Sequence, residues 1–85
     1  MNRTVILFNL EEAHEEIGLI IRDVKRDSAG YSEERLRRAM EHVMHHVNCA
    51  WNARNARVGA LDDVGEDEIA AWSGYPTDLV PLAAK

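Results

Sequence analysis

Apolar residues recur along the first half of the chain at a spacing that is typical of an amphipathic helix. They follow steps of 3, 4, 3, 1 and 3 residues, at Leu10, Ala13, Ile17, Ile20, Ile21 and Val24. Residues three or four positions apart share one face of an α-helix. The pattern therefore predicts a helix over residues 10–27. Its acidic residues gather near the start and its basic residues near the end, as the helix dipole favours.

A second helical pattern follows over residues 32–57. Its apolar positions are separated by 4, 3, 4 and 3 residues, at Leu36, Met40, Val43, Val47 and Ala50. Ser32 is a suitable N-cap residue for this helix. Since only about four residues join the two segments, we expect an antiparallel helical hairpin. The side chains expected to be buried in it are Ile17, Ile21, Val24, Leu36, Met40, Val43 and Val47.

The chain before the first helix is expected to be an N-terminal arm over residues 1–8. Within it, Thr4–Phe8 is apolar and partly β-branched, which is typical of a short strand. Asn9 is then the expected N-cap of the first helix. Glu12 stands three residues later, where the glutamate of a capping box reaches back to the cap.

The last third of the chain is expected to hold one short helix. Residues 60–65 are acidic and indicate a loop, and residues 66–73 begin with three acidic side chains and precede Gly74 and Pro76. Residues 74–85 form a tail. The predicted fold class is all-α, a helical hairpin with a short third helix packed across it, in one domain over residues 1–85. A homodimeric four-helix bundle is an alternative, because two hairpins could together bury the wide apolar seam of the second helix.

The charge of the chain narrows the classes of partner. Fifteen acidic and ten basic side chains give a formal net charge of −5. Binding to nucleic acid or to an anionic membrane relies on lysine and arginine, so nucleic acid and membrane partners are not expected. Cys49 is the only cysteine, which excludes a disulfide within the chain. With no targeting segment or membrane span in the sequence, the cytoplasm is the expected location.

Histidine and cysteine gather on two turns of the second predicted helix. The candidate metal ligands are His42, His45, His46 and Cys49. Pairs such as His42/His46, His45/Cys49 and His46/Cys49 are three or four residues apart, which lets two side chains reach one ion. Zinc prefers imidazole and thiolate but takes four ligands in a structural site, and one helix rarely supplies more than two. Zinc or another transition metal is therefore the alternative to having no cofactor.

The polar face of the same helix is unusual in composition. It carries His42, His45, Asn48, Cys49, Asn52 and Asn55. Asparagine and histidine are poorer helix formers than the glutamate and lysine that usually cover a solvated face. We therefore interpret this face as a contact surface for another protein or for the tail of the chain itself.

These observations favour a binding module over an enzyme. The predicted function is a small acidic helical protein that acts through protein–protein contact, as inhibitors, immunity proteins, antitoxins and adaptors do, with a second protein or a second copy as partner. A His/Cys metal-binding protein is the alternative. Enzyme activity comes third, because no pattern of residues predicts a substrate pocket.

Overall fold

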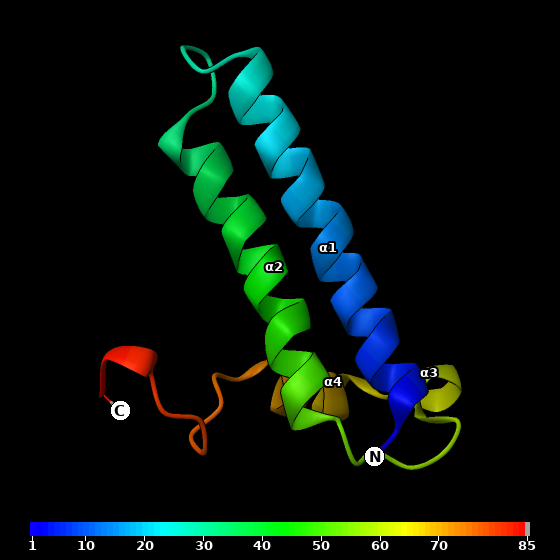
Figure 1. The fold of residues 1–85 in the computed structure, drawn as a ribbon. Coiled ribbons are helices and arrows are strands. Elements are labelled where there is room, and N and C mark those ends of the chain that lie inside the picture. Colours follow the sequence, from blue (N-terminus) through cyan, green and yellow to red (C-terminus); the bar gives the residue numbers. More distant parts are fainter. Residues whose placement is uncertain (85) are drawn as a thin grey trace.

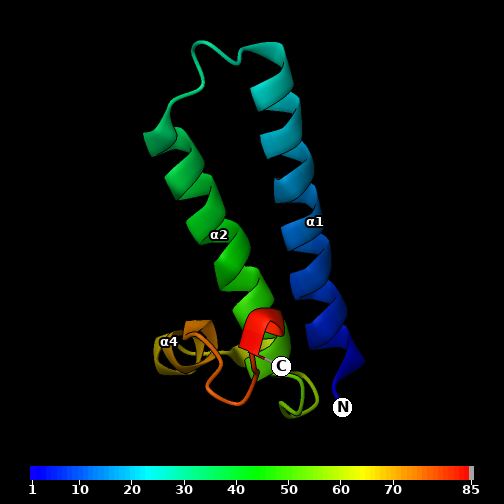
Figure 2. The same ribbon diagram turned by 60° about the vertical axis from the view of Figure 1, so that its left-hand side comes forward.

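Figure 1 shows the computed structural model, which describes residues 1–84. Two long helices, α1 (Arg3–Arg26) and α2 (Glu33–Asn52), run antiparallel to each other. Helices α3 (Ala60–Asp63) and α4 (Glu66–Ser73) lie at the end of the hairpin that also holds the N-terminus (Figures 1 and 2). A 3-10 turn over Leu82–Ala84 closes the described tail. The predicted all-α fold, a hairpin with a short helix packed against it, is confirmed.

The N-terminal arm differs from the prediction, because residues 3–8 are part of α1. Asn2, not Asn9, is the N-cap, and its Oδ1 accepts a hydrogen bond from the backbone N–H of Val5 at 3.2 Å. The Asn2 side-chain amide also donates to the carbonyls of Ala56 (3.2 Å) and Arg57 (3.0 Å). The preference of β-branched residues for strands is a weak local effect, and these tertiary bonds override it.

Helix α2 ends at Asn52, earlier than the expected residue 57. Ala53 is buried, and the backbone N–H of Ala56 donates to the Ala53 carbonyl at 2.9 Å, so the chain turns away from the helix axis there. Gly59 then adopts a φ of 80°, a left-handed conformation that glycine takes without strain. The short helix α3 follows where a loop was expected, and α4 spans the range predicted for it.

A small apolar cluster lies at the end of the hairpin that holds the N-terminus, where residues of α1, α3 and α4 meet the end of α2. Val5 from α1, Ala53 after α2 and Ala60 from α3 are each about 1% exposed. Leu61 and Trp72 pack against them and are partly buried. Among the residues that the structure describes, no buried apolar side chain is larger than valine. The chain alone therefore has a small core.

The core of the hairpin is where the structure departs most from the sequence prediction. Of the seven residues expected to be buried, only Val43 is, at 5% exposed. The other six are 37–49% exposed: Ile17, Ile21, Val24, Leu36, Met40 and Val47. Helix α1 instead buries Val5, Asn9 and Ala13. The two helices thus pack through small and polar residues together with Val43, which leaves the larger apolar residues of each seam outside their contact.

Candidate functional site

The exposed seams of α1 and α2 form one surface, which we call the apolar face. It consists of Leu10, Ile17, Ile21 and Val24 from α1 with Leu36, Met40 and Val47 from α2. At its lower end a groove of about 350 Å³ is lined by Ile6 and Leu10 from α1 and by Val47, Ala50 and Trp51 from α2. Because side chains of both helices line this single groove, the two seams lie on the same side of the hairpin.

Most of the charged side chains lie away from the apolar face, although Arg54 lines the groove at its lower end. Glu12 and Glu16 of α1 lie close enough to His46 for their negative charges to affect the pKa of its imidazole. On α2, Arg37 forms ion pairs with Glu34 (2.6 Å) and Glu41 (3.2 Å). At about 100° per residue, these acidic and basic residues fall outside the arc that carries Leu36, Met40 and Val47. Desolvating the apolar face therefore removes few charges from water.

The apolar face stands about a quarter turn from the contact within the hairpin. On α1, the mean direction of Leu10, Ile17, Ile21 and Val24 differs by roughly 90° from that of the buried Val5, Asn9 and Ala13, at about 100° per residue. A helix with one neighbour needs a single apolar side. A helix in a four-helix bundle contacts two neighbours about a quarter turn apart, and this is the arrangement that α1 presents.

The surface area of the chain is large for its mass. The chain exposes 6395 Å² at 9.6 kDa, whereas a compact monomer of this mass exposes about 5,100 Å². Its radius of gyration is 14.8 Å, compared with roughly 12 Å for a compact domain of this length. The excess of about 1,300 Å² is comparable to the area that each subunit of an obligate homodimer buries, on the order of 1,000–2,500 Å².

The candidate metal ligands form two close contacts between nitrogen or sulfur atoms, and the rings of His45 and His46 also lie next to each other, with centroids 5.0 Å apart. Nε2 of His42 lies 3.2 Å from Nε2 of His46. Nε2 of His45 lies 3.8 Å from Sγ of Cys49. Burial raises the pKa of the Cys49 thiol. Among the described residues, no three His, Cys, Asp or Glu side chains gather in an arrangement that could hold one metal ion, so the four candidates do not surround a single point.

The Nδ1 atom of each histidine in the His42/His46 pair has a partner on α1. Nδ1 of His46 lies 2.9 Å from Oδ1 of the buried Asn9, and Nδ1 of His42 lies 3.4 Å from Oε2 of Glu16. The pKa of His46 is below its ordinary value, mainly because the ring is partly buried. Repulsion from the neighbouring imidazoles of His42 and His45 lowers it further. These contacts couple α1 to α2 on the side of the hairpin away from the apolar face.

The asparagines of α2 bind the chain's own C-terminal third. The Asn48 amide donates to the carbonyl of Ser73 at 3.0 Å, and the Asn52 amide donates to the carbonyls of Trp72 (2.7 Å) and Gly74 (2.6 Å). Terminal helix carbonyls lack partners within the helix, so these bonds satisfy the end of α4. The part of the predicted contact surface that carries Asn48 and Asn52 therefore contacts the chain itself. Contact of this surface with another protein stays a prediction.

The tail is also held at Trp51. The indole N–H of Trp51 donates to Oδ1 of Asp78 at 2.9 Å, and this bond is the main cause of a lowered pKa of the Asp78 carboxyl. The Arg54 guanidinium stacks over the Trp51 ring, 3.7 Å from its centroid, and lies 3.6 Å from Asp78. The beginning of the tail is thereby fixed beside the base of the hairpin.

Replacing Asn52 by alanine should loosen α4 without unfolding the hairpin. Two carbonyls at the end of α4 lose their donor, and a lost bond of this kind costs about 1–3 kcal/mol. Amide hydrogen exchange over Glu66–Ser73 should then become roughly 5- to 100-fold faster, while exchange in the middle of α1 stays unchanged. The control is Asn55→Ala at an exposed position. Equal exchange in both variants would contradict the role given to Asn52.

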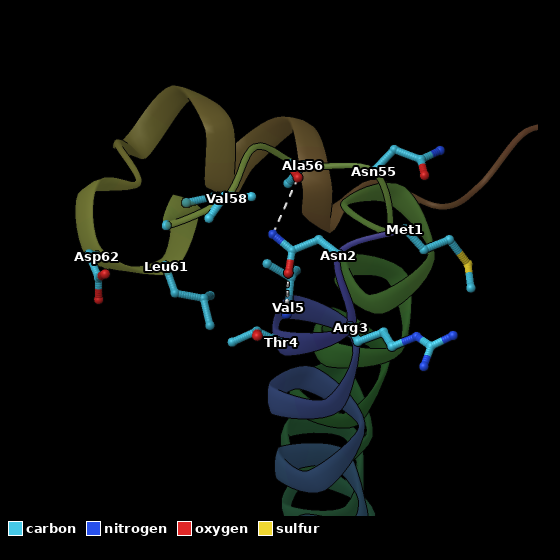
Figure 3. A pocket seen from close by; sticks show the side chains of 12 residues that line it. Met1, Asn2, Arg3, Thr4, Val5, Asn55, Ala56, Val58, Leu61 and Asp62 are labelled. Carbon is cyan, nitrogen blue, oxygen red and sulfur yellow. Dashed lines mark hydrogen bonds between the residues drawn. The ribbon is translucent and has the colours of Figure 1, made fainter.

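A hollow beside the start of α1 offers no group of converging reactive side chains. It measures about 550 Å³ and lies between the start of α1 and the segment around α3. Figure 3 shows Arg3 and Asp62 at its edges, pointing away from each other, with Asn2 and Val5 between them. Asn55, a residue of the predicted contact surface, also lines it. The Asn2 amide is already bonded to backbone carbonyls, so the hollow is walled mainly by the residues that close the fold.

Comparison with known proteins adds no functional assignment. No family model, curated protein or solved structure matches this chain. Within residues 1–84, no helix is both long and apolar enough to cross a membrane.

Proposed function

We propose that this protein is a protein-binding module whose apolar face docks against a second copy of the same chain. Two hairpins would form an antiparallel four-helix bundle. The observation that carries the proposal is that the side of each helix with the large apolar residues is exposed and does not face the other helix. The large apolar residues of both seams are exposed on one side, while small and polar residues make the contact within the hairpin.

Three features support a second copy as the occupant. The excess surface of about 1,300 Å² matches what one subunit buries in an obligate homodimer. The apolar face lies about a quarter turn from the hairpin contact, as the second neighbour of a bundle helix requires. A two-fold interface joins the same patch on both subunits, so a charge-poor apolar patch is complementary to itself.

The tail of the same chain is not placed to fill this role. Figures 1 and 2 show it at the base of the hairpin, away from the long upper part of α1 and α2. Trp51 and Asn52 hold its beginning there. In the proposed dimer, the apolar face is buried and the histidine side faces outward. The assembly would belong to the binding or regulatory class, with an outer surface open to further proteins.

The proposal predicts a thermal stability that depends on protein concentration. Dimerisation adds about 1.4 kcal/mol to the free energy of unfolding for each tenfold rise in concentration, because only the folded chain associates. For a dimer of this size, Tm should rise by about 3–6 °C per tenfold step. Circular dichroism melts over a hundredfold range measure this. A Tm that stays constant over that range would contradict the proposed dimer.

A further inference from the structure

We infer that His42 and His46 form a binding site for one divalent transition-metal ion, with Asn9 and Glu16 as the groups that orient the two imidazoles. His45 and Cys49 do not take part. The site lies on the side of the hairpin away from the apolar face. It goes beyond the proposed dimer, because neither the metal nor the dimer needs the other.

The group beside Nδ1 of each ring, a hydrogen-bond partner for His46 and an ion-pair partner for His42, determines which nitrogen carries the proton. The Asn9 amide nitrogen donates to the Val5 carbonyl at 3.0 Å, which turns its oxygen toward Nδ1 of His46. An amide oxygen only accepts, so Nδ1 of His46 is the protonated nitrogen. The Glu16 carboxylate, 3.4 Å from Nδ1 of His42, favours a proton there for the same reason. In the neutral rings, both Nε2 atoms are then left with lone pairs.

These two lone pairs are 3.2 Å apart. Two acceptors at this distance repel each other unless a proton or a metal cation lies between them. Imidazole nitrogens bind a transition metal at about 2.0–2.1 Å, which places two ligands on one ion roughly 2.9–3.4 Å apart for angles between the square-planar and the tetrahedral value. The separation of the two Nε2 atoms falls within this range.

The outer contacts are those expected around a metal-binding histidine. Such a ligand usually donates its other N–H to a carboxylate or a carbonyl-type oxygen, which fixes its orientation and raises its basicity. Glu16 and Asn9 occupy these two places. The His42 side chain is half exposed, so water can fill the remaining coordination positions. Imidazole ligands with open positions suit copper, nickel and zinc, which makes this class of ion the expected one.

Zinc titration of the untagged, full-length protein at neutral pH tests the site. Calorimetry should show one ion per chain. His42→Gln or His46→Gln should weaken binding roughly a hundredfold or more, because the second imidazole no longer acts at high effective concentration. Glu16→Gln should weaken it roughly tenfold, since it removes only an orienting contact. NMR of the imidazole nitrogens should place the change at Nε2 of both rings.

His45→Gln and Cys49→Ser are the matched controls, and both should bind zinc as the unmodified protein does. Circular dichroism of each variant checks that the helices persist. Unchanged affinity in both His42→Gln and His46→Gln would overturn the proposal. So would an equal loss in His45→Gln or Cys49→Ser. A failure here leaves the concentration dependence of Tm unaffected, so the metal site and the dimer are tested separately.

Discussion

The double variant Ile17→Glu and Ile21→Glu is expected to be a monomer under conditions in which the unmodified protein is a dimer. Both side chains lie near the middle of the apolar face and are 41% and 49% exposed in the single chain. Complete burial of an isoleucine side chain is worth about 1.5–3 kcal/mol, and roughly half of that remains to be gained at a side chain that is already half buried in the single chain. Two substitutions per chain act twice in a symmetric dimer, so the loss is roughly 3–6 kcal/mol before the cost of burying glutamate is added. Sedimentation velocity measures the result.

The control for this variant is Leu19→Glu. Leu19 is similarly exposed at 37% but lies beside Glu16, Asp23 and Arg35, in a shallow hollow on the other side of the hairpin. A milder pair, Ile17→Val and Ile21→Val, removes one methylene at each site and should weaken the dimer by about 1–3 kcal/mol while leaving the chain folded. If Leu19→Glu dissociates the dimer as fully as the isoleucine variant does, the apolar face is not the interface.

Val43→Asp is expected to unfold the protein. Val43 is 5% exposed and lies on α2 between the two helices. A buried carboxylate without a partner costs several kcal/mol, and the free energy of unfolding of a small domain is only about 5–15 kcal/mol. Loss of the helical circular dichroism signal at room temperature measures this effect.

The same substitution at Val58 is the matched control. Val58 is 99% exposed, so Val58→Asp should change the free energy of unfolding by less than about 0.5 kcal/mol. Urea titrations of both variants compare the two sites directly. A Val43→Asp protein as stable as Val58→Asp would show that the contact between α1 and α2 is not the one described.

The helices of the hairpin could be predicted from the sequence, whereas their contact could not. The spacing of Leu36, Met40, Val43 and Val47 identified an apolar side of α2, and that side exists. Periodicity tells which residues share a side but not which neighbour covers it. The side chains at the α1 contact include Asn9 and Ala13, which carry little hydrophobic signal. In the proposed dimer Leu36, Met40 and Val47 are buried by another chain, whereas Val43 is already buried within the hairpin.

The N-terminal turn was missed for a different reason. Its cap depends on Asn2, whose amide reaches Ala56 and Arg57, more than fifty residues away in the sequence. Local propensity cannot register such contacts, so the β-branched residues Thr4 and Val5 indicated a strand. The Asn at position 2 is itself a favoured cap residue and was the available signal.

The candidate site was found only in part. The clustering of histidines on α2 was visible in the sequence, and the structure divides them into two pairs. The local pattern does not identify Asn9 and Glu16, the partners of His46 and His42, because Asn9 is a favoured cap residue and Glu16 belongs to an acidic helix start. In an antiparallel hairpin these residues lie nearly level with the two histidines, so the helix register was the signal that could have identified them.

Sedimentation equilibrium of the unmodified protein tests whether the apolar face is buried against a second copy of the chain. Measured at several micromolar concentrations without added metal, the mass should be twice the 9.6 kDa of one chain. It should fall toward that of a single chain only on dilution or in the Ile17→Glu and Ile21→Glu variant. A mass of 9.6 kDa at every concentration, with the helices intact, would contradict this burial.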